Sequence, residues 1–164
     1  MKKVLVALML VLPMSVFAQK FGHFNMTDIA QAMPEFAAGQ QELEAKSKVY
    51  QDELQRMQDE FKVKLEDYQK NAESLPDAIK ERREQELTDL QQKMQDYVDK
   101  SRQDLAQFEA QKMKEIQEKL LKAVEDVGQA GGYVYIFDVA SIPYVSKTLS
   151  VDVTNDVKTK LGIR

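Results

Sequence analysis

The chain has 164 residues, with a formal net charge of −4, 30% charged residues and 43% hydrophobic residues. It contains no cysteine, which excludes a disulfide framework, a thiol nucleophile and a thiolate metal site. The acidic balance disfavours non-specific binding to nucleic acid or anionic lipid. Only 6 glycines and 4 prolines occur, so we expect few turns and long helices.

Residues 1–18 have the three parts of a secretory signal peptide. Lys2 and Lys3 form the positive start, residues 4–12 form an apolar run, and Val16 and Ala18 fit a small-x-small cleavage site. We expect cleavage after Ala18 and export from the cytoplasm. The apolar run is short for a membrane span; the alternative is an uncleaved N-terminal anchor helix.

The start of the mature chain predicts a strand followed by a helix. Residues 20–26 read as a short strand, with apolar bulk from Phe21, Phe24 and Met26. We expect a short helix over residues 28–33. Pro34 then suits the first turn of a new helix, where its missing N–H costs little.

Apolar residues next recur with a spacing of seven, which predicts a long coiled-coil-like helix. They are Phe36, Leu43, Tyr50 and Met57, with Leu54, Phe61 and Tyr68 offset by four. Residues 71–76 form a turn in which Ser74 is a candidate N-cap, and a second helix follows to about residue 127. We therefore expect an antiparallel helical hairpin, or arm, over residues 35–128. A helix of about fifty residues is about 75 Å long.

Three glycines, Gly128, Gly131 and Gly132, are expected to end the second helix. Residues 133–139 then predict a strand buried on both faces. Residues 142–146 predict another strand, and residues 155–161 predict a final helix capped by Asp152 or Thr154.

The strand-bearing segments, residues 19–34 and 129–164, are expected to form a β-rich base. A unit this small struggles to bury an adequate core alone. We therefore expect the base to oligomerise, with strand residues at the interface. The candidates are Phe24, Tyr133, Tyr135, Ile136 and Phe137.

No catalytic or metal-binding constellation is evident. His23 is the single histidine, and without cysteine it cannot make a zinc site of the usual ligand types. Asp138 lies inside the apolar run of residues 133–139. It is either a buried, perturbed general base or, as we favour, a strand-end aspartate bonded to backbone N–H groups of a turn or helix. We expect a protein that is not an enzyme and that needs no metal or cofactor.

The apolar residues of the hairpin extend beyond the strict heptad stripe, at Val49, Val63, Val98, Met113 and Leu121. Some apolar surface is therefore expected to stay open to a partner, although packing between the two helices is the alternative for most such residues. Methionine and aromatic side chains suit surfaces that accept many shapes. The candidate binding residues are Met57, Phe61, Leu65, Tyr68, Leu87 and Met94.

These parts, in this order, resemble the Skp/OmpH family of periplasmic chaperones. The resemblance covers nearly the whole chain. It is carried by the signal peptide, the charged hairpin, Asn25 and Met26, and a C-terminal block: Gly132, Tyr133, Phe137, Asp138, Tyr144, Ser146, Asp152, Thr154, Asp156, Val157 and Leu161.

The resemblance implies an α+β fold in which three helical arms project from a small β-barrel formed by a homotrimer. It implies a periplasmic, ATP-independent holdase that binds unfolded outer-membrane β-barrel proteins before their assembly. The best-known member is basic whereas this chain is acidic, so no lipopolysaccharide site is carried over. The alternative function is a structural coiled-coil spacer that links components of the cell envelope.

Overall fold

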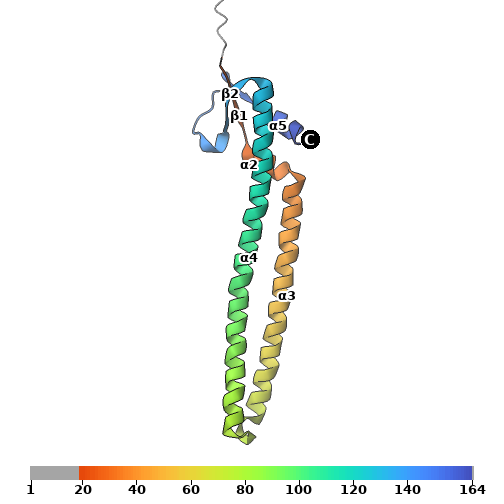
Figure 1. Ribbon diagram of the computed structural model, residues 1–164, viewed down its shortest axis with the longest axis vertical. Helices are drawn as coiled ribbons and strands as arrows, with labels where there is room; N and C mark the ends of the chain where they lie inside the picture. The colour runs from red at the N-terminus through yellow and green to blue at the C-terminus, as the bar shows by residue number, and fades with distance from the viewer. Residues whose placement is uncertain (1–18, 164) are drawn as a thin grey trace, which may run out of the picture. The chain divides into compact units, whose positions relative to one another are not determined.

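The computed structural model describes residues 19–163, so the predicted signal peptide lies outside the described residues. The chain is mostly helical, with one small sheet (Figure 1). The described residues group into two compact units. The hairpin unit comprises residues 27–121, and the sheet unit comprises residues 19–26 and 122–162. The predicted α+β class with a long helical hairpin is confirmed.

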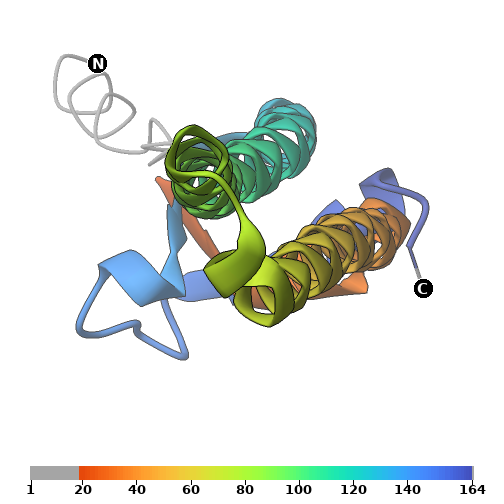
Figure 2. The ribbon, with the colours of Figure 1, turned by 90° about the horizontal axis from the view of Figure 1, so that it is seen from below.

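The hairpin unit contains the short helix α2 from its second residue, the long helix α3, and the long helix α4 as far as residue 121. Helix α2 spans Met26–Ala32, α3 spans Pro34–Asn71 and α4 spans Asp77–Gly131. Figures 1 and 2 show α3 and α4 side by side, running in opposite directions from one tight turn. The heptad pattern of the first helix, the apolar side of the second and the single turn between them therefore predicted the two long helices and their antiparallel pairing.

The ends of α3 follow from local chemistry. Met33 has an extended backbone and Pro34 begins the helix, where no N–H is needed. At the other end, the 3-10 turn Ala72–Ser74 leads to Leu75, whose extended backbone is typical of a residue before proline. The prediction that Ser74 caps α4 was wrong, because its hydroxyl donates to the carbonyl of Asn71 at 2.8 Å.

The core of the hairpin unit is a narrow row of aliphatic side chains. The buried members are Ile29, Ala30, Met33, Met57, Leu90, Ile116 and Leu120. Beside them, the rings of Tyr50 and Tyr97 pack edge to face with centroids 6.0 Å apart. A two-helix unit has little interior, so most apolar side chains along the hairpin are only half-buried.

The sheet unit contains three parallel strands in the order β2-β1-β3. Strand β1 spans Lys20–Phe24, β2 spans Tyr133–Asp138 and β3 spans Ser150–Asp152. The helix α5, Thr154–Lys160, follows β3 and buries Val157. Because β1 is central, β2 and β3 each present a free edge in the single chain.

Two aspartates fix the connections of this sheet. The carboxylate of Asp138 accepts hydrogen bonds from the backbone N–H groups of Met26 and Ala140, at 3.2 and 3.3 Å. This confirms the strand-end role predicted for it. The carboxylate of Asp152 accepts from the N–H of Thr154, the first residue of α5, at 2.9 Å. The prediction that Asp152 or Thr154 is the N-cap was wrong, because Val153 occupies that position and makes no side-chain cap hydrogen bond.

The strand predicted over residues 142–146 was wrong. A 3-10 turn, Val139–Ser141, and an irregular loop occupy this stretch, and the loop extends to one side of β2 (Figure 1). The Oγ of Ser146 accepts from the N–H groups of Thr148 and Leu149, which bends the chain before β3. Pro143 lacks the N–H that a strand would use.

Helix α4 continues about four residues further than expected. It includes Gly128 and ends at Gly131, and Gly132 has a positive φ of 64°. A glycine inside a helix costs only about 1 kcal/mol, which neighbouring contacts can offset. The left-handed backbone of Gly132 is what ends the helix.

Candidate functional site

Strand β2 exposes large apolar side chains in the single chain. The side chain of Tyr135 is 58% exposed, and Val134 and Phe137 are also exposed. The ring of Tyr135 stacks on Phe21 and on Phe137, with centroids 6.4 and 5.7 Å apart. The strand was predicted to be buried on both faces, and within one chain it is not.

The predicted interface residues separate into two groups. Phe24 is buried inside the sheet unit, whereas Tyr135 and Phe137 are exposed. Tyr133 and Ile136 are half-buried, and Lys20 lies 4.1 Å from the centroid of the Tyr133 ring. Further exposed apolar residues in this unit were not predicted from the sequence as interface residues: Val134, Tyr144, Leu149 and Val151. Val134 and Val151 lie on the edge strands β2 and β3, whereas Tyr144 and Leu149 lie in the loop between these strands.

The predicted binding residues of the hairpin are mostly half-buried between α3 and α4. Met57 is the exception, because only 6% of it is exposed and it belongs to the packing of the two helices. The half-buried residues are Phe61, Leu65, Tyr68, Leu87 and Met94. The Tyr68 hydroxyl donates to the Glu84 carboxylate, and this hydrogen bond raises the pKa of Tyr68.

Some apolar surface of the hairpin is open, as the width of the apolar pattern predicted. Val49 and Val63 on α3 are exposed, as are Met113 and Leu121 on α4. These four residues are spread along both helices among charged side chains. The hairpin therefore offers many small apolar contacts rather than one large patch.

One flank of the hairpin is bridged by polar contacts between α3 and α4. Lys46 pairs with Asp104 at 2.8 Å, and the Tyr50 hydroxyl donates to the same carboxylate. Further along, Lys112 pairs with Glu42 at 2.7 Å, and Lys119 pairs with Glu35. We call these contacts the bridged flank.

The bridged flank changes the titration of its members. The hydrogen bond from Lys46, and then that from Tyr50, lowers the pKa of Asp104. The hydrogen bond from Lys119 likewise lowers the pKa of Glu35, and the hydrogen bond to Asp104 raises the pKa of Tyr50. These shifts report ion pairing between the helices, not a catalytic base.

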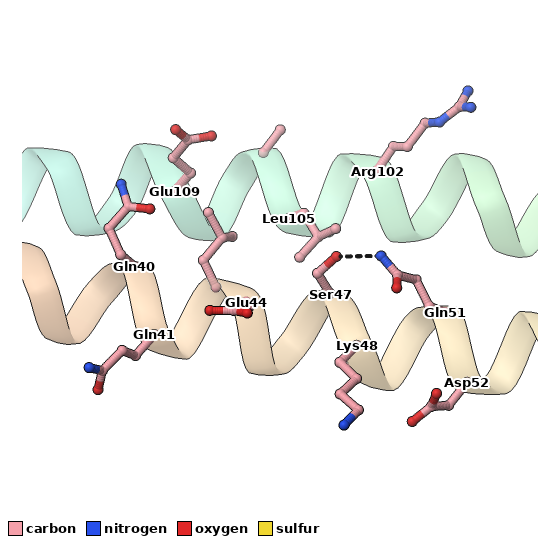
Figure 3. A pocket seen from close by; sticks show the side chains of 12 residues that line it. Gln40, Gln41, Glu44, Ser47, Lys48, Gln51, Asp52, Arg102, Leu105 and Glu109 are labelled. Carbon is pink, nitrogen blue, oxygen red and sulfur yellow. Dashed lines mark hydrogen bonds between the residues drawn. The ribbon is translucent and has the colours of Figure 1, made fainter.

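The opposite flank is open and holds a groove of about 970 Å³ between α3 and α4 (Figure 3). Gln40, Ser47 and Gln51 point from α3 toward α4 in this view. Leu43 and Leu105 supply its apolar surface. We call this hollow the open-flank groove. The sequence pattern did not point to it, because a heptad stripe does not distinguish the two flanks of a hairpin.

Other kinds of site were sought in the same part of the chain. Among residues 19–163, no group of three or more histidine or acidic side chains is arranged to hold a metal ion. No helix within those residues has the length and apolar character needed to cross a membrane. The single histidine, His23, contacts the Ser150 hydroxyl through Nδ1 at 2.8 Å and joins β1 to β3.

Comparison with known proteins places the chain in a family. The model for OmpH-like outer membrane proteins matches residues 20–161. The chaperone protein Skp of Yersinia enterocolitica is 26% identical over 146 residues, which is 88% of this chain and 89% of the relative. The chaperone protein Skp of Vibrio cholerae is 29% identical over 131 residues, which is 77% of this chain and 75% of the relative. The family predicted from the sequence is thus confirmed, and the chain belongs to the OmpH-like family.

Proposed function

We propose that the mature chain is an ATP-independent holdase of the periplasm that binds unfolded outer-membrane proteins and prevents their aggregation. Two relatives of the chain are named as chaperones, and each aligns with at least three quarters of it. The predicted signal peptide of residues 1–18 would deliver the chain to the periplasm.

The hairpin is the feature that supports this function best. The hairpin has many apolar side chains, each of which exposes a small area, and charged side chains separate them. Val49, Val63 and Met113 are exposed examples. Contacts of this kind are individually weak, so a bound chain is held without being trapped. The half-buried residues Phe61, Leu65, Tyr68, Leu87 and Met94 complete the proposed client surface.

The protein is proposed to work as a homotrimer assembled through the sheet unit. Strands β2 and β3 have unpaired edges, which are ready-made sites for pairing with another chain. The exposed side chains of Val134, Tyr135 and Phe137 on β2 would then be covered by neighbouring copies. Burial of this apolar surface would stabilise the assembly.

The experiment is an aggregation assay with a porin unfolded in urea and diluted into buffer without nucleotide. Light scattering should stay low when the mature protein is present in excess and rise when it is omitted. Lysozyme at the same concentration is the control for non-specific protection. Undiminished scattering with the mature protein present would contradict the holdase function, and tight binding to one folded envelope protein alone would favour a spacer.

A further inference from the structure

We propose that the open-flank groove binds an extended polypeptide segment that carries a basic side chain. The proposal rests on the proposed function and assigns part of client binding to a defined place on the hairpin. The groove lies entirely within the hairpin unit, between residues 40–52 of α3 and residues 102–109 of α4.

The two flanks of the hairpin differ in how their polar groups are satisfied. On the bridged flank, Lys46, Glu42 and Glu35 all reach partners on α4. Among the residues that line the open-flank groove, no hydrogen bond or ion pair joins α3 to α4. The difference follows from the positions of these residues around α3. Gln40, Ser47 and Gln51 lie on the side of the apolar stripe opposite to the bridged flank.

The groove presents groups that match a peptide backbone. The amides of Gln40 and Gln41 have no hydrogen-bond partner among the described residues, and the Gln51 amide bonds only to the Ser47 hydroxyl, at 3.3 Å. Side-chain amides and hydroxyls can both donate and accept. They can therefore pair with the N–H and C=O groups of any extended segment.

The dimensions of the groove fit a short stretch of extended chain. Residues 40–52 of a helix rise by about 18 Å. An extended segment of five or six residues covers about the same distance, at about 3.3 Å per residue. Leu43 and Leu105 would contact apolar side chains of such a segment at alternate positions.

The charges on the rims argue for a basic segment. The acidic lining residues are Glu44, Asp52 and Glu109, against Lys48 and Arg102. Arg102 already lies 3.9 Å from Asp99. Among the other charged lining residues, none has an ion-pair partner in the part of the chain that the structure describes, and Glu44, Asp52 and Glu109 outnumber Lys48. A lysine or arginine of the bound segment would supply the missing partner. The leucines are too few to accept a lipid tail, and the carboxylates disfavour a polyanion.

The test uses the full mature protein and a fluorescein-labelled peptide of about ten residues, the length of a β-barrel strand. The peptide alternates valine and serine and has one central lysine; a second peptide has glutamate there. Fluorescence anisotropy measures Kd for each peptide. The wild-type protein should bind the lysine peptide more tightly than the glutamate peptide.

Two tryptophan variants one helical turn apart test the place of binding. Ala106 lines the groove, whereas Ala110 is exposed outside it. Ala106→Trp should fill the groove and raise Kd about tenfold or more, a loss of about 1.4 kcal/mol or more. Ala110→Trp should leave Kd unchanged. Equal Kd values for the two variants would overturn the proposal.

A charge variant keeps the test decisive if Ala106→Trp disturbs folding. Glu109→Lys changes a rim residue without adding bulk inside the groove, so it should weaken the lysine peptide and tighten the glutamate peptide. An unchanged preference would overturn the proposal. The proposal would also be overturned if Ala106→Trp changed the oligomeric mass of the protein and left peptide binding unaltered. The groove would then be a contact between copies of the chain.

The outcomes separate this proposal from the holdase function. If the wild-type protein keeps the porin soluble while none of the groove variants alters peptide binding, only the groove assignment is wrong. If the wild-type protein binds neither the peptide nor the porin, both proposals fail.

Discussion

Asp138 illustrates how single side chains organise the sheet unit. Its carboxylate accepts from the N–H of Met26, the first residue of α2, and from the N–H of Ala140. Close packing acts in the same unit at Gly22, where an added Cβ would lie 3.1 Å from Ile136 Cγ1 and from the Tyr133 ring. A larger residue at position 22 would push these two side chains apart.

At the same scale, the buried residue Ile29 should carry more stability than any exposed valine of the hairpin unit. Ile29 has 0% exposure and Val63 has 66%. Ile29→Ala should lower the free energy of unfolding by about 2–5 kcal/mol because it removes buried apolar area and leaves a cavity. Val63→Ala, the matched control, should change it by about 0.5 kcal/mol or less. Urea unfolding followed by circular dichroism measures both, and equal effects would contradict the burial of Ile29.

The chemistry of single side chains also explains why the prediction for Asp138 was right and the strand predicted over residues 142–146 was wrong. The role of Asp138 was predictable because a carboxylate at a strand end has nearby backbone N–H groups to bind. The loop at residues 142–146 was mistaken for a strand because its composition is apolar and β-branched. The hydrogen bonds of the Ser146 hydroxyl that bend this segment depend on side-chain geometry that composition does not reveal.

Among the elements, the hairpin was predictable because both helices have a long apolar side and one short turn-like stretch joins them. The difference between its flanks was not, because it depends on which charged side chains meet across the helices. Lys46 meets Asp104 and Glu42 meets Lys112 only once the register of α3 against α4 is set. The candidate groove follows from that register.

The bridged flank should make the hairpin sensitive to acid. A carboxylate whose pKa is lowered by folding stabilises the fold above its unfolded pKa and loses this contribution as pH falls through the folded pKa. Asp104 and Glu35 are such groups, with ordinary values of 3.8 and 4.5. Asp104→Asn should therefore lower the thermal midpoint at neutral pH, and the difference from wild type should shrink as the pH falls below the ordinary value of 3.8 and through the lowered pKa of Asp104.

The control for the acid prediction is Asp59→Asn. Asp59 accepts a hydrogen bond from Gln55 on the same helix, at 3.0 Å, and among residues 19–163 it makes no hydrogen bond or ion pair with α4. Its replacement should leave the pH dependence of the thermal midpoint unchanged. A pH dependence of Asp104→Asn identical to that of the wild type would show that the bridged flank does not stabilise the hairpin. Because both partners are partly exposed, salt should weaken the effect.

At the scale of the whole molecule, the division into an arm over residues 35–128 and a base from the remaining mature segments stays a prediction, as does the trimer. The sequence indicated an undersized base with too much apolar strand surface. The exposed Tyr135 and Phe137 of the single chain agree with that argument. The copy number comes from the family resemblance, since neither the composition nor the fold of one chain sets it.

Sedimentation equilibrium of the mature protein, with and without a stoichiometric unfolded porin, tests the proposed trimeric holdase. We expect a mass of three chains for the protein alone and of three chains plus one porin for the mixture. Tyr135→Asp should reduce the mass to that of one chain, because it places a charge where a neighbouring copy would bury the ring. A wild-type monomer at micromolar concentration, or a trimer that sediments apart from the porin, would contradict it.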